Sequence, residues 1–438
     1  MDHGEAARRL FSVYKHTNYT PPQQPHHGNL ITVLPSGETV TSAPSTTTYK
    51  GPSTQLLVDS TPISTFRSLL TPPLAYDVTA IGTKFEGSTE HIPQSSVVEI
   101  SAPKAERASF PIPNLWITIY GLFGLYPTDE HIPLVFSDVA NEEELRTYLL
   151  KTGLGRLYQG TVSQKPFSRE AIYLSRGAFW QGAGCHGYHN FGWLRRDSGF
   201  FPSLPSFTRN ELVIASHPLR PPKPEPGQVV YKRWCAGVGQ SLEFVHFDVE
   251  GLKDKEPPKK DQNGIALSQH LQTFHKWHND ERVNAGWGEK GTLQAHRDYI
   301  VKVMGDPGVI ACMMCWDGQL MGYVEIVWVK ENHVAQHYPT GVVPGDWERG
   351  IHVLVGESKF AGAGRAEIWI RSLCHYLFLA DPRTYRVIGE PREDNIAIIK
   401  TVFNSEFHIE TKFDFPYKRS VLVLHPRDRF FKSNRLHL

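Results

Sequence analysis

Residues 346–369, DWERGIHVLVGESKFAGAGRAEIW, combine two kinds of residue that can do chemistry. His352 enters an apolar run, and an imidazole titrates near neutral pH, so it can accept or donate a proton there. Gly362 and Gly364 stand before a run with helical spacing. Glycine lets backbone approach a ligand closely, and N–H groups at a helix N-terminus bind phosphate oxygens. The stretch predicts a proton-transferring histidine beside an anion-binding turn, to which Arg365 can add charge.

Strand and helix signals around this stretch predict the order β-α-α-β-β-β-α-β-α-β-β over 241–425. Asp317-Gly318 is the type I′ turn signal of a hairpin. The predicted strands are 241–250, two within 308–330, 350–356, 385–390, 407–413 and 420–425, and the predicted helices are 266–280, 292–304, 362–380 and 394–404. This alternation is typical of an α/β domain that places His352 and the glycines at one edge of a sheet.

Composition divides the rest of the chain. Residues 20–64 are rich in Pro, Ser, Thr and Gly, which predicts an extended or poorly ordered arm over residues 1–64. Residues 65–215 predict an N-terminal α/β domain, with strands at 96–102 and 115–123 and a capped helix at 141–155. The proline-dense segment 216–228 predicts a linker, so 229–438 forms the C-terminal domain, with a solvated insertion at 252–264.

Charge and hydropathy restrict the partners. The 438 residues carry a net charge of +1, which gives no bulk electrostatic reason to bind nucleic acid or a membrane surface. We find no apolar run near the roughly 18 residues of a spanning helix. His437 and Leu438 form a tail that resembles a peroxisomal import signal, although Leu436 stands where a small residue is usual, so the expected location is the peroxisome or otherwise the cytoplasm.

Two groups of cysteine and histidine could suggest a metal, and neither has the spacing of a site. Five scattered cysteines favour a reducing compartment. Cys312 and Cys315 lie in an apolar run that predicts a core strand, without a second ligand pair. Cys185, His186 and His189 are close in CHGYHN, but we find no distant pair to complete a tetrahedral set. We therefore expect no metal.

The predicted element order and the glycine-rich turn resemble the GNAT family of acyl-CoA-dependent N-acyltransferases. In that family a Gln/Arg-x-x-Gly-x-Gly/Ala turn follows the fourth strand, and KFAGAG fills it here. EPREDNIAIIKTVFNSEF resembles the family's second segment, with Asn395 and Phe407 at the matching places. The resemblance implies a GNAT fold over 241–425 and leaves room for a degenerate GNAT-like N-terminal domain. It also implies a CoA site built from Val353, Leu354, Val355, Lys359, Gly362, Ala363, Gly364, Arg365 and Asn395.

More narrowly, the chain resembles the siderophore-biosynthesis branch, which acylates hydroxylated ornithine or lysine side chains to hydroxamates. The segments that carry this are 275–291, 320–331, 348–357, 386–395 and 415–419, with Glu348 where the branch usually has Asp. The resemblance implies that His352 is the catalytic base. For Asp394 three roles are open: it could orient that imidazole, bind the acceptor amine, or cap a helix. A backbone N–H of Val353 or Leu354 would polarise the thioester carbonyl.

The acceptor is an amino acid, so its α-amino and α-carboxyl groups call for charged partners in a cleft. Candidate substrate-binding residues are His278, Arg282, Trp287, Glu325 and Lys418; each could instead be a surface ion pair or an edge residue. Trp277 is expected in the core. The resemblance allows a homo-oligomer.

Three functions remain open from the sequence. Chain length and the N-terminal arm resemble fungal hydroxyornithine transacylases, which favours anhydromevalonyl-CoA as donor. The alternative keeps the reaction and uses acetyl-CoA with hydroxyornithine or hydroxylysine. A third is an inactive CoA-binding interaction protein, because Val402 stands where many GNAT enzymes have the tyrosine that protonates the thiolate.

Overall fold

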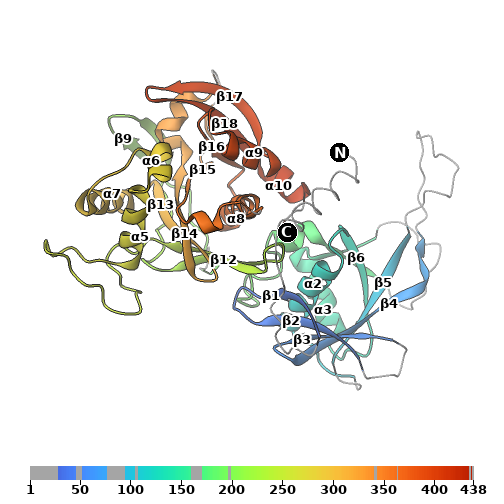
Figure 1. The fold of residues 1–438 in the computed structure, drawn as a ribbon. Coiled ribbons are helices and arrows are strands. Elements are labelled where there is room, and N and C mark those ends of the chain that lie inside the picture. The colour runs from blue at the N-terminus through green and yellow to red at the C-terminus, as the bar shows by residue number, and fades with distance from the viewer. Residues whose placement is uncertain are drawn as a thin grey trace. The chain divides into compact units, whose positions relative to one another are not determined.

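A computed structural model describes residues 28–45, 52–75, 94–103, 107–158, 170–195, 199–339, 343–362, 364–433 and 436. These fall into two compact units that divide between Gly192 and Trp193 (Figure 1). Ala363 and the tail residues His437 and Leu438 lie outside the described residues. Among the helices that are described, none is long and apolar enough to cross a membrane.

The N-terminal unit is built on an eight-stranded sheet in the order β1-β2-β3-β4-β5-β6-β8-β7. Neighbours are antiparallel except β5 and β6, which are parallel and joined through α2 (Ile112–Leu125). The predicted helix at 141–155 is confirmed as α3 (Glu142–Thr152), which ends at Gly153 in the left-handed region. The other elements are β1 (Asn29–Val33), β2 (Thr39–Pro44), β3 (Thr54–Val58), β4 (Thr61–Ala75), β5 (Gln94–Ser101), β6 (His131–Phe136), β7 (Gly155–Leu157), β8 (Ile172–Ser175) and α4 (Arg176–Trp180).

The C-terminal unit has a second eight-stranded sheet in the order β11-β12-β13-β14-β15-β16-β18-β17, beside the hairpin of β9 (Pro205–Arg209) and β10 (Ile214–Pro218). Only β15 and β16 are parallel neighbours, and α8 (Arg365–Ala380) connects them. The strands are β11 (Val229–Cys235), β12 (Gln240–His246), β13 (Val309–Trp316), β14 (Gln319–Trp328), β15 (Arg349–Val355), β16 (Arg386–Gly389), β17 (His408–Phe415) and β18 (Lys418–Pro426). The remaining helices are α5 (Gln269–His278), α6 (Glu281–Trp287), α7 (Leu293–Gly305), η1 (Val329–Glu331), η2 (His333–His337), η3 (Ser358–Phe360), α9 (Ile396–Asn404) and α10 (Arg427–Ser433).

The two sheets share one connectivity. In each, the fifth and sixth strands run parallel around a helix, and the last two strands exchange places in the sheet order. The C-terminal unit adds α5, α6 and α7 between its second and third strands, β12 and β13. The predicted order over 241–425 is therefore confirmed except for α6, a short helix between the two that were predicted, and the N-terminal unit has the same strand connectivity without these helices.

Two of the sequence predictions for the N-terminal half are wrong. Residues 29–58 form three paired strands, not an arm, because pairing between the strands is accompanied by burial of Val40, Thr41, Leu56 and Leu57. Residues 115–123 form the centre of α2 rather than a strand. They are buried on all sides, and a continuous apolar run does not by itself distinguish a buried helix from a buried strand.

The proline-rich segment 216–228 is part of the C-terminal unit, whose boundary lies ahead of it at Trp193. Arg220 anchors it: the guanidinium pairs with Glu331, donates to the Asp346 carbonyl (2.6 Å) and lies 4.4 Å from the Trp328 ring centroid. The segment therefore packs along β14 and β15 instead of acting as a free linker.

The parallel strand pair differs between the units in a way that matters for function. In the C-terminal unit, pairing of β15 with β16 ends at Gly350–Ile388, so the second half of β15 diverges from β16. In the N-terminal unit, β5 pairs with β6 as far as Ile100–Phe136, and the Ser137 N–H donates to the Ile100 carbonyl at 2.9 Å. Within the described residues, only the C-terminal sheet therefore opens between these strands.

Candidate active site

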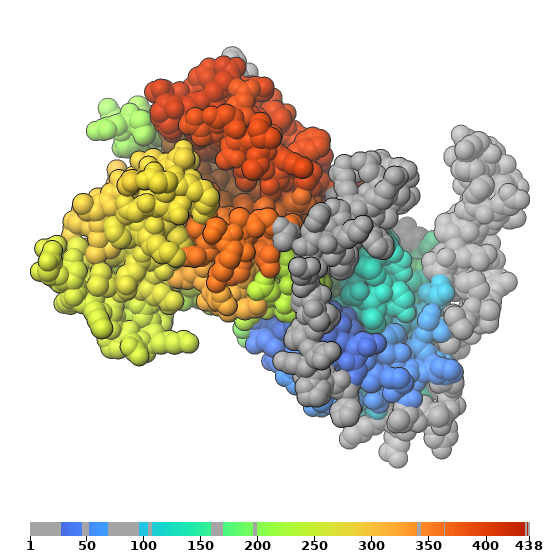
Figure 2. Space-filling view, in the orientation of Figure 1, coloured from blue at the N-terminus to red at the C-terminus, as the bar shows by residue number. Residues whose placement is uncertain are grey.

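A cavity of about 730 Å³ lies where β15 and β16 diverge. Its walls come from α6 and α7 on one side, β13 to β16 at the base, and α8, α9 and the start of β18 on the other side. In Figure 2, α8 (orange) is visible between the yellow residues of α5 to α7 and the red C-terminal residues. The cavity brings together elements that are far apart in the sequence, with His352 of β15 among its lining residues.

His352 lies between two carboxylates. Its Nδ1 is 3.4 Å from Oε2 of Glu325, which stands directly opposite it on β14. Its Nε2 is 2.9 Å from Oε1 of Glu390, the residue after β16. The imidazole is 20% exposed and the two carboxylates are buried. The three side chains form a continuous carboxylate–imidazole–carboxylate row across three strands.

Further groups hold the two carboxylates in place. Glu325 Oε1 accepts hydrogen bonds from the Tyr299 and Tyr323 hydroxyls, the latter at 3.0 Å. The Lys418 Nζ donates to the Glu390 backbone carbonyl at 3.1 Å and lies 3.9 Å from its carboxylate. Glu390 Oε2, by contrast, is buried without a hydrogen-bond partner. One carboxylate is thus fully engaged, while the other keeps an oxygen available to a ligand.

These contacts decide the protonation of the row. Burial alone would lower the pKa of His352, but the charge of Glu390 and the hydrogen bonds to both carboxylates outweigh it and raise the pKa to about 10. Burial would raise the pKa of Glu390, and His352 and Lys418 lower it to about 2. The expectation of an imidazole with an ordinary pKa is therefore wrong. Both neighbouring carboxylates therefore favour the protonated form of His352 over the neutral form.

The backbone of β15 presents alternate N–H groups to the open side. The Gly356 N–H donates to the Met321 carbonyl (2.9 Å) and the Val329 N–H to the Glu348 carbonyl (3.1 Å), so even-numbered residues of β15 bond to β14. By strand alternation, Val353 and Val355 point their N–H groups toward the gap. Leu354 does not, so of the two N–H groups expected at the thioester only that of Val353 faces it.

The turn before α8 has the predicted geometry for an anion. Gly362 (φ 81°) and Gly364 (φ 72°) are in the left-handed region, and Gly364 is the N-cap of α8. Lys359 lies just before this turn and donates to the Gln319 side chain at 2.9 Å, and Arg365 donates to Gln240 at 3.2 Å. The first N–H groups of a helix have no partner within it, so they remain for phosphate oxygens.

Most other predicted residues line the cavity: Arg282, Trp287, Glu325, Val353, Leu354, Val355, Asn395 and Lys418. Arg282 donates to the carbonyls of Val355 (2.9 Å) and Gly356 (2.7 Å), which fixes α6 over the end of β15. Asn395 is the N-cap of α9, accepting from the Ile398 N–H at 3.2 Å. Trp277 is buried as expected.

Two predicted residues lie elsewhere. Asp394 is 71% exposed and its carboxylate pairs with Arg392 at 3.0 Å, so the structure does not bring it to His352. His278 is fully buried behind the cavity wall, where its Nδ1 lies 3.0 Å from the Phe274 carbonyl oxygen. Burial lowers the pKa of His278 to about 4, so it is neutral and suits a core position.

Sequence reasoning missed the partner of His352. Glu390 lies in the segment 386–395, four residues before Asp394. The sequence feature that indicates it is a carboxylate directly after the buried strand residues VIG. Glu348, which replaces the usual Asp, accepts from Tyr338 (2.7 Å) and from Arg386 at the start of β16. It ties the starts of β15 and β16 together just before they diverge.

The two cysteine and histidine groups differ in exposure: Cys312 and Cys315 are buried, Cys185 and His189 are half-buried, and His186 is exposed. Cys312 and Cys315 are free and buried in β13, and burial raises the pKa of the Cys312 thiol to about 12. Burial also raises the pKa of Cys185 to about 12 and lowers that of His189 to about 4. Among the described residues, no group of three or more His, Cys, Asp or Glu side chains is arranged to hold a metal.

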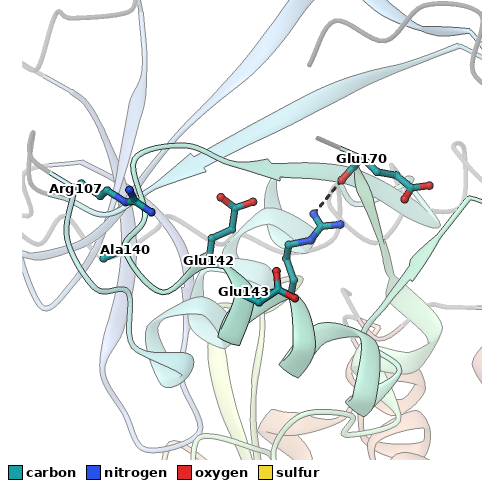
Figure 3. A pocket seen from close by; sticks show the side chains of 6 residues that line it. Arg107, Ala140, Glu142, Glu143 and Glu170 are labelled. Carbon is teal, nitrogen blue, oxygen red and sulfur yellow. Dashed lines mark hydrogen bonds between the residues drawn. The ribbon is translucent and has the colours of Figure 1, made fainter. Parts of the chain in front are cut away.

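A smaller hollow of about 330 Å³ lies in the N-terminal unit near the start of α3. Its lining, apart from Ala140, consists of carboxylates and guanidinium groups, and Arg146 donates to the Glu170 carbonyl at 3.0 Å (Figure 3). Among its described lining residues there is neither an open strand pair nor a glycine turn.

Known proteins with similar sequences point the same way. An acetyltransferase (GNAT) domain matches residues 266–415. Acyltransferase ato1 of Omphalotus olearius is 36% identical over 331 residues, which cover 74% of this chain and 77% of the relative. Hydroxyornithine transacylase SID3 of Ajellomyces capsulatus is 34% identical over 335 residues (73% and 72%). The N(5)-hydroxyornithine:cis-anhydromevalonyl coenzyme A-N(5)-transacylase SIDF of Beauveria bassiana is 33% identical over 362 residues (75% and 74%).

Proposed function

We propose that this chain acylates the hydroxylated side-chain nitrogen of N5-hydroxyornithine. The chain belongs to the family of GNAT-domain acyltransferases that includes these relatives, and it is an acyl-CoA-dependent N-acyltransferase. The product is a hydroxamate for siderophore synthesis. The observation that carries the proposal is the Glu325–His352–Glu390 row at the floor of a cavity opened between β15 and β16. The names of SID3 and SIDF support hydroxyornithine as acceptor and anhydromevalonyl-CoA as donor.

In the proposed complex the CoA pyrophosphate lies on the N-terminus of α8, near Lys359, and the thioester lies in the gap beside β15. The Val353 N–H polarises the thioester carbonyl, which stabilises negative charge that develops on its oxygen. The acceptor nitrogen attacks the carbonyl carbon from the side of the cavity that carries His352 and Glu390. Holding both substrates in one cavity replaces a collision in solution with a positioned attack.

The row supplies both proton transfers. Once bonded to the carbonyl carbon, the attacking nitrogen is positively charged and strongly acidic, so the carboxylate of Glu390 suffices to take its proton. The carbon–sulfur bond breaks, and the imidazolium of His352 donates its proton to the thiolate. The proton on Glu390 then returns to His352 across the 2.9 Å contact. This route needs no tyrosine at position 402, where Val402 is buried.

The test is hydroxamate formation from N5-hydroxyornithine with anhydromevalonyl-CoA and acetyl-CoA, measured together with CoA binding. Turnover with anhydromevalonyl-CoA at the higher kcat/KM supports the proposal. Turnover with acetyl-CoA alone would replace the donor. CoA binding without turnover of either donor would make the chain an inactive CoA-binding protein. His352→Gln and Glu390→Gln should each reduce kcat by orders of magnitude while CoA affinity is retained.

A further inference from the structure

We propose that Val303, Val309 and Val327 form the closed end of the acyl-chain pocket and thereby set the length of acyl group that the enzyme transfers. This inference rests on the proposed function, because the inference places the acyl donor on one side of His352 and the acceptor on the other. It follows from a chemical difference between the parts of the cavity that lie on either side of His352.

One part of the cavity is apolar and lies over β13 and β14. Val309 pairs with Val327 across these strands, and Glu325 lies two residues before Val327 on the same face of β14. The two positions are about 6 to 7 Å apart along the strand. From α7, Val303 lines the same space, one helical turn after Tyr299. We call this part, with Trp287, the apolar lobe.

The other part is charged and lies over β16 and β18. It contains Glu390, Arg392 and Lys418, with the ring of Tyr417. His333 lines it from η2, and the charges of His352, Glu390 and Lys418 all act on the pKa of this histidine, which burial lowers. We call this part the charged lobe. Figure 1 shows the two sides: α6 and α7 beside β13 and β14, and across β15 the strands β16 to β18.

The two substrates differ in the same way as the two lobes. The acceptor carries an α-amino and an α-carboxyl group, which need charged or polar partners, so it occupies the charged lobe. An acyl chain beyond its carbonyl is largely hydrocarbon, with one terminal hydroxyl in the anhydromevalonyl group, and burial of its carbon atoms against valine and aromatic side chains is favourable. The Val353 N–H holds the thioester in the gap between the lobes, so the chain extends over the row of His352 into the apolar lobe.

The three valines are suited to measure chain length because they are small and stiff. Val327 is 3% exposed and fixed within β14, whereas Val303 and Val309 keep part of their surface toward the cavity. An acetyl group has one carbon beyond its carbonyl and a branched five-carbon chain has four, so the longer chain extends further toward the three valines. A hydrophobic pocket discriminates by roughly ten- to a hundredfold for each methylene that fits or fails to fit.

The experiment compares acetyl-CoA with 3-methylbut-2-enoyl-CoA, a branched five-carbon donor, using N5-hydroxyornithine as acceptor. Val303→Phe and Val309→Phe each place a ring in the apolar lobe. We expect either change to lower kcat/KM for the branched donor relative to acetyl-CoA roughly tenfold or more. Val301→Phe is the matched control, because Val301 lies on the same helix and is 43% exposed; it should leave the ratio unchanged.

A binding measurement without acceptor separates this inference from the proposed function. Calorimetry should show that wild-type protein binds the branched acyl-CoA more tightly than CoA, and that Val303→Phe removes the difference. If the acceptor were not hydroxyornithine, turnover would fail in the wild type but this binding difference would persist. The inference is wrong if folded Val303→Phe and Val309→Phe both keep two quantities within twofold of wild type. These are the ratio of kcat/KM for the two donors and the difference in affinity between the branched acyl-CoA and CoA. Val303→Leu serves if the larger side chain prevents folding.

Discussion

Replacing Glu390 by Gln should destabilise the protein in a pH-dependent way that follows from the row at His352. The substitution keeps the volume of the side chain but removes the charge that lies 2.9 Å from the imidazole Nε2. His352 then keeps only the more distant carboxylate of Glu325, at 3.4 Å. A buried imidazolium that loses its nearer counter-charge is destabilised, because burial favours its neutral form.

The magnitude follows from the two pKa values. The pKa of His352 is raised from 6.5 to about 10, and each tenfold change in proton affinity corresponds to about 1.4 kcal/mol. The net effect of burial and the two carboxylates is therefore roughly 5 kcal/mol. The fall of the Glu390 pKa from 4.5 to about 2 corresponds to roughly 3 kcal/mol. The smaller figure is the better measure of the substitution, because the larger one includes Glu325. We therefore expect a loss of about 3 kcal/mol near pH 6.

The sign of the pH dependence is fixed by the same values. A raised histidine pKa contributes its full stability below pH 6.5, and that contribution is lost as the pH rises to about 10. The lowered pKa of Glu390 contributes above pH 4.5 and is lost as the pH falls to about 2. The difference between wild type and Glu390→Gln should accordingly be largest between pH 4.5 and 6.5 and shrink steadily toward pH 10.

Urea unfolding at a series of pH values measures this difference directly. Glu393→Gln is the matched control, since Glu393 lies three residues away and its carboxylate pairs with Lys412 and Arg419 at the surface. A pH-independent difference between wild type and Glu390→Gln over pH 6 to 10, or a difference no larger than the control, would refute the charged row.

Three further predictions concern the histidines, a glycine and the CoA stoichiometry. Nitrogen-15 spectra of histidine-labelled protein at pH 8 should contain a protonated ring that disappears in His352→Gln; a neutral His352 ring would contradict the proposed proton donor. Gly356→Ala should cost about 1 to 3 kcal/mol in urea unfolding or prevent folding, because its Cβ would lie 2.0 Å from the Trp277 ring, whereas Gly286→Ala in α6, with no heavy atom within 4 Å, should be neutral or stabilising. Calorimetry should find one CoA per chain, because β5 stays paired with β6 where β15 leaves β16; a second site of similar affinity would show that the N-terminal unit also binds.

Local patterns predicted much of the C-terminal fold, because its elements obey local rules. The Asp317-Gly318 turn has both residues at positive φ (49° and 74°), as a type I′ turn requires. The helices that begin at Gln269 and Leu293 start after Ser268 and Thr292, whose side chains accept from backbone N–H groups. Where a segment is stabilised by distant partners, as in strands β1 to β3 or in α2, local composition misled.

The chemistry of the site depended on contacts that no local pattern contains. His352 could be recognised as a proton carrier, but whether it accepts or donates depends on Glu325 and Glu390, which reach it from two other strands. Asp394 seemed the better partner from its place at a helix start, yet its side chain lies at the surface beside Arg392.

The same dependence on register decides which backbone groups can bind the thioester. A strand turns successive N–H groups to opposite neighbours, so the choice between Val353 and Leu354 is a question of parity. The parity is set by Gly356 and Met321 at one end of β15 and by Val329 and Glu348 at the other. The Tyr338 hydroxyl and the Arg386 guanidinium both donate hydrogen bonds to the Glu348 carboxylate and hold it in place. The register that begins beside Glu348 points the Val353 N–H into the gap and places His352 opposite Glu325 for proton transfer.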